Sequence, residues 1–340
     1  MNLPYRTRRI LKRIAVILLA VVLAAILAGA LWFLWLQRFV VYTRDGALLD
    51  MSLPADVPAG QTVTKPKKPE KVTIYYNEGE NAINTSKELT QITGYYADTA
   101  ALSKGPETVL AQVQALPTGT PVMIDVKSPK GSFYYSSLVG TGRYFKEDKT
   151  AAMDELIAYL GSSDLYAIAR LPALRDYAYG LNHVPDGLPT AGGYLWADDD
   201  YCYWLNPGSQ GTITYLMEIV TELKNLGFDE VVFDEFYFPD TKEIVYKADK
   251  AETLAAAANT LVTTCTTESF ALSFVGQDTT FVLPEGRSRL YMEDVAAANA
   301  ALIAQQTGLA NPAVNLVFLT EVHDTRFDAY SVLRPLEAAH

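Results

Sequence analysis

The sequence predicts an α/β protein, a (β/α)8 barrel of the TIM-like kind preceded by one N-terminal transmembrane helix. Two observations support this fold class. Residues 14–36 contain no charged side chain, and such a run is long enough to cross a bilayer as a helix. From residue 72 to residue 340, short β-rich runs alternate with helical stretches. That alternation implies parallel βαβ units, and the length is normal for one barrel.

The uncharged run reads IAVILLAVVLAAILAGALWFLWL. As a helix it would span roughly 34 Å, against a hydrocarbon core of about 30 Å. The first thirteen residues contain five Arg or Lys and no acid, so the positive-inside rule predicts a cytoplasmic N-terminus and an extracellular remainder. A cleaved signal peptide is the alternative. Its apolar core is typically only about 7–15 residues, and a small-residue cleavage site should follow it.

The chain therefore divides into four predicted segments. These are a cytoplasmic basic tail (1–13), a transmembrane helix (14–36), an extracellular linker (37–71) and a barrel domain (72–340). The linker is predicted because residues 52–71 are rich in proline, polar and charged residues and show no apolar period.

Charge and cysteine content limit the partners. The chain has a formal net charge of −11, and the part beyond the basic tail is more acidic still. Such a surface repels phosphate backbones, so no nucleic-acid partner is expected. Cys202 and Cys265 both lie in the outer part, where a disulfide is permitted, but the sequence leaves their pairing open.

Seven runs are predicted as strands, with helices between them. The strands are Gln91–Tyr96, Pro121–Val126, Leu165–Leu171, Glu230–Phe236, Phe270–Val275, Ser288–Met292 and Val314–Thr320. The helices are Glu107–Ala115, Ala151–Leu160, Thr212–Leu226, Ala251–Thr264 and Glu293–Gln306. An eighth strand is either Ile74–Tyr76 or near the C-terminus. A doubly wound open sheet is the alternative fold, although no Gly-x-Gly-x-x-Gly loop supports it.

Ionisable residues follow almost every predicted strand, and barrels carry their function at the C-terminal ends of the strands. The residues are Asp125, Lys127, Arg170, Asp176, Asp234, Glu235, Glu293 and Glu321. Strand ends also begin loops, so a surface role for any one of these acids remains open. Asp234 and Glu235 are distinctive because they end an apolar strand and point to opposite faces.

Two carboxyl groups at neighbouring strand ends are what hydrolysis of a glycosidic bond requires, one as proton donor and one as base or nucleophile. Aromatic residues in the predicted loops, among them Tyr96, Trp204 and Tyr237, are suited to contact sugar rings. Other chemistries leave no comparable pattern. The chain has three histidines and no metal-ligand spacing, nucleophile elbow or phosphate loop, so neither a metal nor a cofactor is expected.

Several of these segments resemble the DUF4015 type of glycoside hydrolase-like domain over roughly residues 91–240. The resemblance rests on Gly94-Tyr95-Tyr96, Val122-Met123-Ile124-Asp125-Val126-Lys127, Tyr166-Ala167-Ile168-Ala169-Arg170, Trp204-Leu205-Asn206-Pro207 and Leu226-Gly227-Phe228-Asp229-Glu230-Val231-Val232-Phe233-Asp234. The family pattern then continues as x-x-Arg-Phe-Pro after the aspartate. Here Tyr237 stands in place of that arginine.

The resemblance implies a barrel akin to α-amylase-like enzymes, with a carbohydrate polymer or oligosaccharide as substrate. Asp234 is the catalytic carboxylate it implies, with Glu293, Glu235 or Glu321 as partner in that order. Asp125, Lys127, Arg170, Asp176, Trp204, Tyr237, Tyr96 and Glu321 are then the candidate substrate-binding residues. Two other interpretations remain: a carbohydrate-binding barrel without catalysis, and a scaffold for envelope proteins.

Overall fold

The computed structural model describes residues 40–43, 46–49, 88–140, 142 and 144–336. The chain divides into two compact units, residues 1–80 and 81–340, which are described separately. The predicted tail 1–13, transmembrane helix 14–36 and candidate strand Ile74–Tyr76 lie outside the described residues. Among the residues that are described, no helix has the length and apolar character needed to cross a membrane.

The first unit contains a short β-hairpin. Strand β1 (Val40–Thr43) pairs antiparallel with β2 (Gly46–Leu49), with Val40 opposite Leu49. Both strands fall within residues 37–71, so this part of the predicted linker is paired in a sheet. The remainder of that segment lies outside the described residues.

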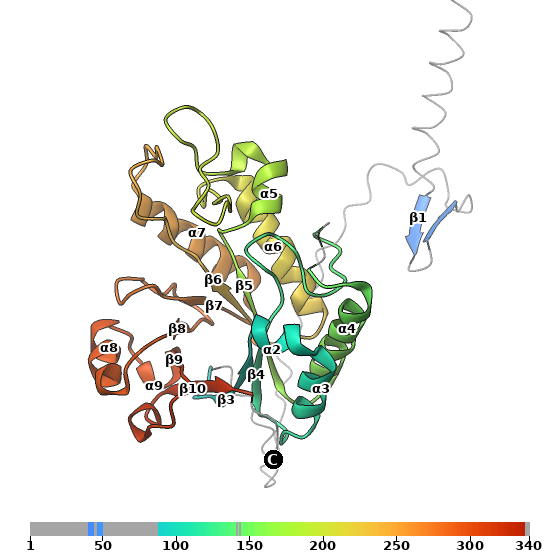
Figure 1. Ribbon diagram of the computed structural model, residues 1–340, viewed down its shortest axis with the longest axis vertical. Helices are drawn as coiled ribbons and strands as arrows, with labels where there is room; N and C mark the ends of the chain where they lie inside the picture. The colour runs from blue at the N-terminus through green and yellow to red at the C-terminus, as the bar shows by residue number, and fades with distance from the viewer. Residues whose placement is uncertain (1–39, 44–45, 50–87, 141, 143, 337–340) are drawn as a thin grey trace, which may run out of the picture. The chain divides into compact units, whose positions relative to one another are not determined.

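The second unit is a closed barrel of eight parallel strands in the order β10-β3-β4-β5-β6-β7-β8-β9 (Figure 1). The strands are β3 (Thr93–Ala97), β4 (Pro121–Asp125), β5 (Tyr166–Pro172), β6 (Glu230–Asp234), β7 (Ala271–Val275), β8 (Leu290–Met292), β9 (Leu316–Leu319) and β10 (Ser331–Pro335). The predicted barrel and its seven strands are confirmed, and the eighth strand is the C-terminal one.

Helices connect the strands and lie on the outside of the barrel (Figure 1). They are α2 (Thr99–Lys104), α3 (Pro106–Gln114), α4 (Glu147–Ser162), α5 (Tyr177–Asn182), α6 (Gln210–Asn225), α7 (Lys250–Cys265), α8 (Ala300–Gln306) and α9 (Pro312–Asn315), with short 3-10 turns at Val184–Asp186, Ala297–Asn299 and Thr325–Phe327. The helix predicted over 293–306 is wrong in its first part. Asp294 has a left-handed backbone, with φ of 55°, which ends any helix there.

Alternate residues of each strand fill the inside of the barrel, as the two-residue period of a strand requires. The interior cluster consists of apolar or aromatic residues: Ile92, Met123, Ile168, Val232, Val275, Tyr291, Val317, Leu319 and Leu333. The other strand residues, such as Val231 and Phe233, pack outward against the helices. The barrel is therefore a packed core, and a ligand site has to lie at one of its ends.

A buried ion pair closes the N-terminal end of the barrel. Glu230, the first residue of β6, is completely buried and accepts a hydrogen bond from the guanidinium of Arg289, which is 1% exposed. The Glu230 carboxylate also accepts from three hydroxyl groups, those of Ser273 (2.5 Å), Tyr166 (2.9 Å) and Tyr291 (3.0 Å). Because every partner of this charge comes from another strand or from a strand flank, the network ties that end of the barrel together.

Candidate active site

The C-terminal mouth of the barrel brings together six of the residues singled out from the sequence. Each lies two or four residues after a residue of the interior cluster along the same strand. Because alternate strand residues share a face, its side chain points into the mouth. They are Tyr96, Asp125, Arg170, Asp234, Glu293 and Glu321. The mouth is thus lined by one guanidinium, one phenol and four carboxyl groups from six different strands.

Arg170 is the central cation of the mouth. Its Nε donates to Oδ1 of Asp125 at 2.7 Å, and its Nη1 donates to Oε1 of Glu293. The second oxygen of Asp125 accepts from both the backbone N–H (2.7 Å) and the hydroxyl (2.8 Å) of Thr99. Four fixed hydrogen bonds therefore hold Asp125, Arg170 and Glu293 as one chain across β4, β5 and the end of β8.

Asp234 lies beside this chain. Burial raises the pKa of the Asp234 carboxyl above its ordinary value, with the Arg170 charge acting in the opposite direction and Asp125 adding to the rise. Burial likewise raises the pKa of Glu293, opposed by Arg170 and reinforced by Asp234. The charge of Asp234 thus raises the pKa of Glu293, and the guanidinium of Arg170 acts on both carboxyl groups. Carboxyl groups perturbed by burial and by nearby charge are typical of catalytic sites.

Glu235 has three unusual properties. Its backbone is left-handed, with φ of 50°, a conformation that costs free energy for a residue other than glycine. Its Oε1 accepts from Nη1 of Arg175 at 3.1 Å, whereas its buried Oε2 has no hydrogen-bond partner within the described part of the chain. Burial raises the pKa of Glu235 to about 7, opposed by Arg175 and reinforced by Asp234. Burial therefore keeps this carboxyl protonated to a higher pH than an ordinary glutamate.

Arg175 organises a second cluster next to the mouth. Besides Glu235, it contacts Oδ2 of Asp198 at 2.5 Å and Oδ2 of Asp200 at 2.7 Å. The same oxygen of Asp198 accepts from the indole N–H of Trp204 at 3.0 Å. The sequence analysis did not select Arg175 or the two aspartates as site residues. Arg175 follows the end of a strand, and Arg175-Asp176 is one of the segments that resemble the family pattern, whereas the sequence gives no such signal for Asp198 and Asp200.

Lys127 and Asp176 form a buried pair, and the charge of Lys127 acts on the pKa of Glu235. Their side chains are both fully buried and form an ion pair of 2.8 Å. Lys127 also donates to the carbonyl of Pro172, and Asp176 accepts from the hydroxyl of Tyr215 and from the N–H of Tyr179. All these contacts are internal. The structure therefore gives this pair a supporting place among the loops, and the substrate contact expected from the sequence stays a prediction.

The predicted aromatic residues flank the mouth at different depths. Trp204 is buried, and its ring meets the ring of Tyr237 edge to face, with centroids 4.9 Å apart. Burial raises the pKa of Tyr237, and the Glu235 charge adds to the effect, so this phenol lies close to that carboxyl. Tyr96 is half-buried, and its pKa is raised by burial and then by Glu321, which places both at the mouth.

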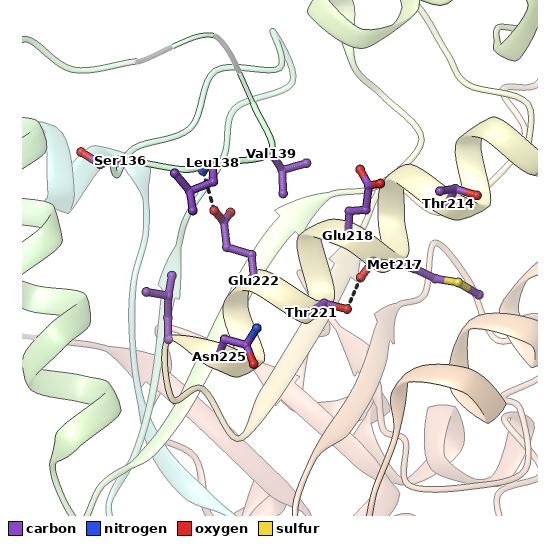
Figure 2. Close-up of a pocket in the computed structure, with 10 residues that line it drawn as sticks. Ser136, Leu138, Val139, Thr214, Met217, Glu218, Thr221, Glu222 and Asn225 are labelled. Carbon is purple, nitrogen blue, oxygen red and sulfur yellow. Dashed lines mark hydrogen bonds between the residues drawn. The ribbon is translucent and has the colours of Figure 1, made fainter. Parts of the chain in front are cut away.

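Two cavities differ in their relation to this site. One of about 410 Å³ adjoins the mouth, between the residues after β6 and β7, and includes Phe236, Tyr237, Val275, Gln277 and Phe281 in its lining. Another, of about 810 Å³, lies on the outer side of α6, where the carboxylate of Glu222 faces the 136–139 loop (Figure 2). Neither lining includes any of the six mouth residues. The first cavity contains Tyr237, whose phenol is affected by the charge of Glu235, so we assign the ligand site to the mouth and this cavity.

Both cysteines are free thiols. Among the described residues, no group of three or more His, Cys, Asp or Glu side chains is arranged to hold a metal ion.

Solved structures with a similar fold include glycosidases. The α-galactosidase from Lactobacillus brevis gives a TM-score of 0.51 at 11% identity, over 74% of this chain and 38% of that enzyme. The α-galactosidase from Thermus thermophilus gives 0.49 at 13% identity, over 74% and 58%. A hypothetical protein from Ruminiclostridium thermocellum gives 0.43 at 19% identity, over 53% and 96%. At 11% identity the likeness to the Lactobacillus brevis enzyme shows the fold alone. This chain spans less than two thirds of the length of either galactosidase.

A search of curated protein sequences finds no match to this chain. The family comparison does find one, over residues 97–273, which include β4 to β6 and the carboxylates of Asp125, Asp234 and Glu235. This match covers more than half of the chain and agrees with the resemblance found in the sequence. The chain belongs to the DUF4015 family, described as a putative glycosyl hydrolase domain.

Proposed function

We propose that this protein hydrolyses O-glycosidic bonds of an extracellular or cell-surface polysaccharide while tethered to a membrane. The observation that carries the proposal is the pair of adjacent carboxyl groups at the end of β6. Asp234 faces a guanidinium, whereas Glu235 has a pKa of about 7 and a buried oxygen without a partner. Neighbouring acids with different environments are the usual source of separate acid and base roles.

In this mechanism Asp234 is the base or nucleophile. It is directed into the mouth from the interior face of β6, and the attraction of Arg170 favours its ionised form. Arg170 is itself fixed by Asp125 and Glu293, so its charge is already in position before substrate binds. Preorganised charge of this kind stabilises the charge that develops at the anomeric centre and at the attacking carboxylate.

Glu235 is the proton donor. Its raised pKa keeps a proton available at neutral pH, and Arg175 fixes the other carboxylate oxygen at 3.1 Å. The negative charge of Asp234 helps to hold that proton. Departure of the sugar oxygen takes the proton from Glu235, which then returns to the charged form that Arg175 stabilises.

The pH dependence of the reaction tests this assignment. As pH rises through about 7, Glu235 loses its proton. We therefore expect kcat/KM of the unmodified protein to fall with rising pH, which gives the pH profile a descending alkaline limb. Glu235→Gln should lower kcat by about 10²–10⁴-fold and abolish the limb, and it should lose less on aryl glycosides with acidic leaving groups. Profiles over pH 5–9 provide the measurement. A limb that persists in Glu235→Gln and disappears in Glu293→Gln would reassign the donor to Glu293.

The tether is part of the proposal. It is supported by the uncharged run 14–36 and the basic residues before it. We expect the full chain to stay with membranes after an alkaline carbonate wash, and a chain starting at residue 38 to be released. External protease added to intact cells should digest the barrel domain and leave a short protected fragment. A full chain that is released by the wash, or a barrel that is protected in intact cells, would contradict the tethered topology.

The alternative function is carbohydrate binding without catalysis. The observation that favours it is Tyr237, which stands where the family pattern has arginine. In the structure, however, Arg175 provides a cation beside Glu235, the neighbour of Tyr237 at the mouth. The Glu235 variant separates the two functions, because a binding module would retain its ligand and release no sugar in either form.

A further inference from the structure

Three tyrosines lie beside the Arg175 cluster, and two of them, Tyr177 and Tyr201, are exposed. We call Tyr177, Tyr201 and Tyr203 the tyrosine platform. Tyr177 begins α5, and the other two belong to the long connection between α5 and α6. Tyr201 is 78% exposed and Tyr177 is 36% exposed. Exposed aromatic rings have a large apolar face in contact with water, so a ligand that covers them gains free energy.

The platform is rigidly built. The rings of Tyr177 and Tyr203 are stacked, with centroids 5.3 Å apart and planes inclined by 9°. The carbonyl of Tyr203 accepts the N–H of Asp176 at 2.9 Å, and Gly180 permits the approach because a Cβ there would lie 2.7 Å from Cβ of Tyr203. A ligand therefore meets these two rings in a fixed position, and little ordering entropy opposes binding.

Tyr201 is held in an unfavourable backbone conformation. Its φ is 58°, a region that aromatic residues rarely adopt. The turn is fixed by Asp198, whose side chain accepts the N–H groups of Asp200 (3.0 Å) and Cys202 (2.9 Å) and whose carbonyl accepts that of Tyr201. Glycine would satisfy this turn at lower cost. An exposed tyrosine at a strained position is consistent with a role for its ring outside the fold.

The platform is joined to the proposed catalytic centre by a short series of contacts. Arg175 binds the carboxylates of both Asp200 and Glu235. Asp200 precedes Tyr201, and Glu235 is the proposed proton donor, so a single guanidinium links the two. On the other side, Lys130 donates to the carbonyl of Asp200, and its Nζ lies 5.6 Å from the centre of the Tyr177 ring. Contacts through Arg175 and Lys130 therefore connect the platform to Glu235.

We propose that the tyrosine platform is a distal subsite that binds sugar units of an uncharged polysaccharide whose cleaved bond lies at the mouth. This inference rests on the proposed function and extends it to the substrate class. Sugar rings have apolar C–H faces that pack on flat aromatic rings, and their hydroxyls can meet the polar groups around the platform. Asp198, Asp199 and Asp200 directly precede Tyr201, and Arg175 pairs with only two of these three carboxylates, so the excess negative charge of this turn disfavours uronic acids or other anionic units.

The test measures binding to polymers with the full chain in detergent, using affinity electrophoresis in gels that contain soluble starch, galactomannan, barley β-glucan or glycol chitin. Polygalacturonate serves as the anionic polymer. Tyr201→Gly removes the exposed ring and relieves the left-handed residue, so it should fold normally. Tyr177→Ala removes the stacked ring. Tyr194→Ala is the matched control, because Tyr194 lies in the same connection, is also 78% exposed and has no contact with the Arg175 cluster.

We expect the unmodified chain to bind at least one neutral polymer and not polygalacturonate. Each platform variant should bind the neutral polymer roughly three- to tenfold more weakly, as the loss of one aromatic contact implies. Tyr194→Ala should bind as the unmodified chain does. Platform variants should also lose more kcat/KM on the polymer than on a short oligosaccharide of the same linkage.

Three outcomes would overturn the inference. The first is equal binding by Tyr201→Gly, Tyr177→Ala and the unmodified chain. The second is an equal loss in Tyr194→Ala, which would assign the effect to the loop as a whole. The third is binding of polygalacturonate in preference to every neutral polymer. Equal binding by all forms together with normal sugar release would refute the subsite and leave the proposed hydrolase intact. Binding that depends on the platform, without any sugar release, would refute the hydrolase and retain the platform as a sugar-binding surface.

Discussion

Asp234→Asn is expected to lower kcat by about 10³-fold or more, because it removes the carboxylate that we propose as base or nucleophile while retaining its shape. KM should change little, since an amide of the same size preserves the ground-state contacts. The folded protein should be no less stable. Burial raises the pKa of Asp234, so the ionised carboxyl is disfavoured in the folded state and a neutral amide relieves that cost. Initial rates on aryl glycosides and a thermal melt measure both effects.

The same substitution at the opposite end of the barrel provides the control. Asp164 is exposed and lies just before β5, at the end away from the mouth. Asp164→Asn should therefore retain full activity. A kcat within threefold of the unmodified value in Asp234→Asn would remove this residue from the chemistry, whatever the fold. A matching fall in melting temperature would instead assign the loss of activity to unfolding.

Glu230→Gln is expected to destabilise the barrel by about 3–5 kcal/mol, because it leaves the buried Arg289 guanidinium without a counter-charge. Both side chains are almost completely buried at the N-terminal end of the barrel. The amide can still accept from Ser273, Tyr166 or Tyr291, so the predicted loss comes chiefly from the charge. Urea denaturation of the unit 81–340 measures the change in free energy of unfolding.

A double substitution separates the ion pair from general disturbance of the core. Glu230→Gln combined with Arg289→Met removes both charges, so it should be clearly less destabilising than the sum of the two single changes. Glu155→Gln, at an exposed position of α4, should have almost no effect. Strict additivity of the two single changes would show that the ion pair itself contributes nothing to stability.

Much of the barrel could be predicted from the sequence because its signals are local. Buried parallel strands are apolar on both faces, as in Val231-Val232-Phe233, and helices such as α6 show a clear apolar stripe. The final strand is less apparent because β10 pairs with both β9 and β3, and such closure depends on contacts distant in the chain. The helix predicted over 293–306 starts too early because no sequence rule indicates a left-handed Asp294.

The mouth residues could be predicted for the same reason, since strand parity directs Asp125, Arg170 and Asp234 inward. The alternation of strand residues does not show whether a side chain beyond the end of the strand reaches the mouth or turns into the protein. Lys127 lies beyond the same strand end as Asp125, yet it turns into the protein and pairs with Asp176. The cluster around Arg175 depends on a loop that brings Asp198 and Asp200 back to it. Neither the fold of that loop nor the pKa of Glu235 can be derived from residue spacing.

The most direct test of the account is sugar release by the full chain in detergent from a panel of neutral and anionic polysaccharides. New reducing ends would be measured for the unmodified protein beside Asp234→Asn and Glu235→Gln at equal concentration. The account predicts release from at least one neutral polymer by the unmodified protein, and a loss of about 10²-fold or more in each variant. No release from any polymer by folded, polymer-binding protein, or equal release by all three forms, would contradict it.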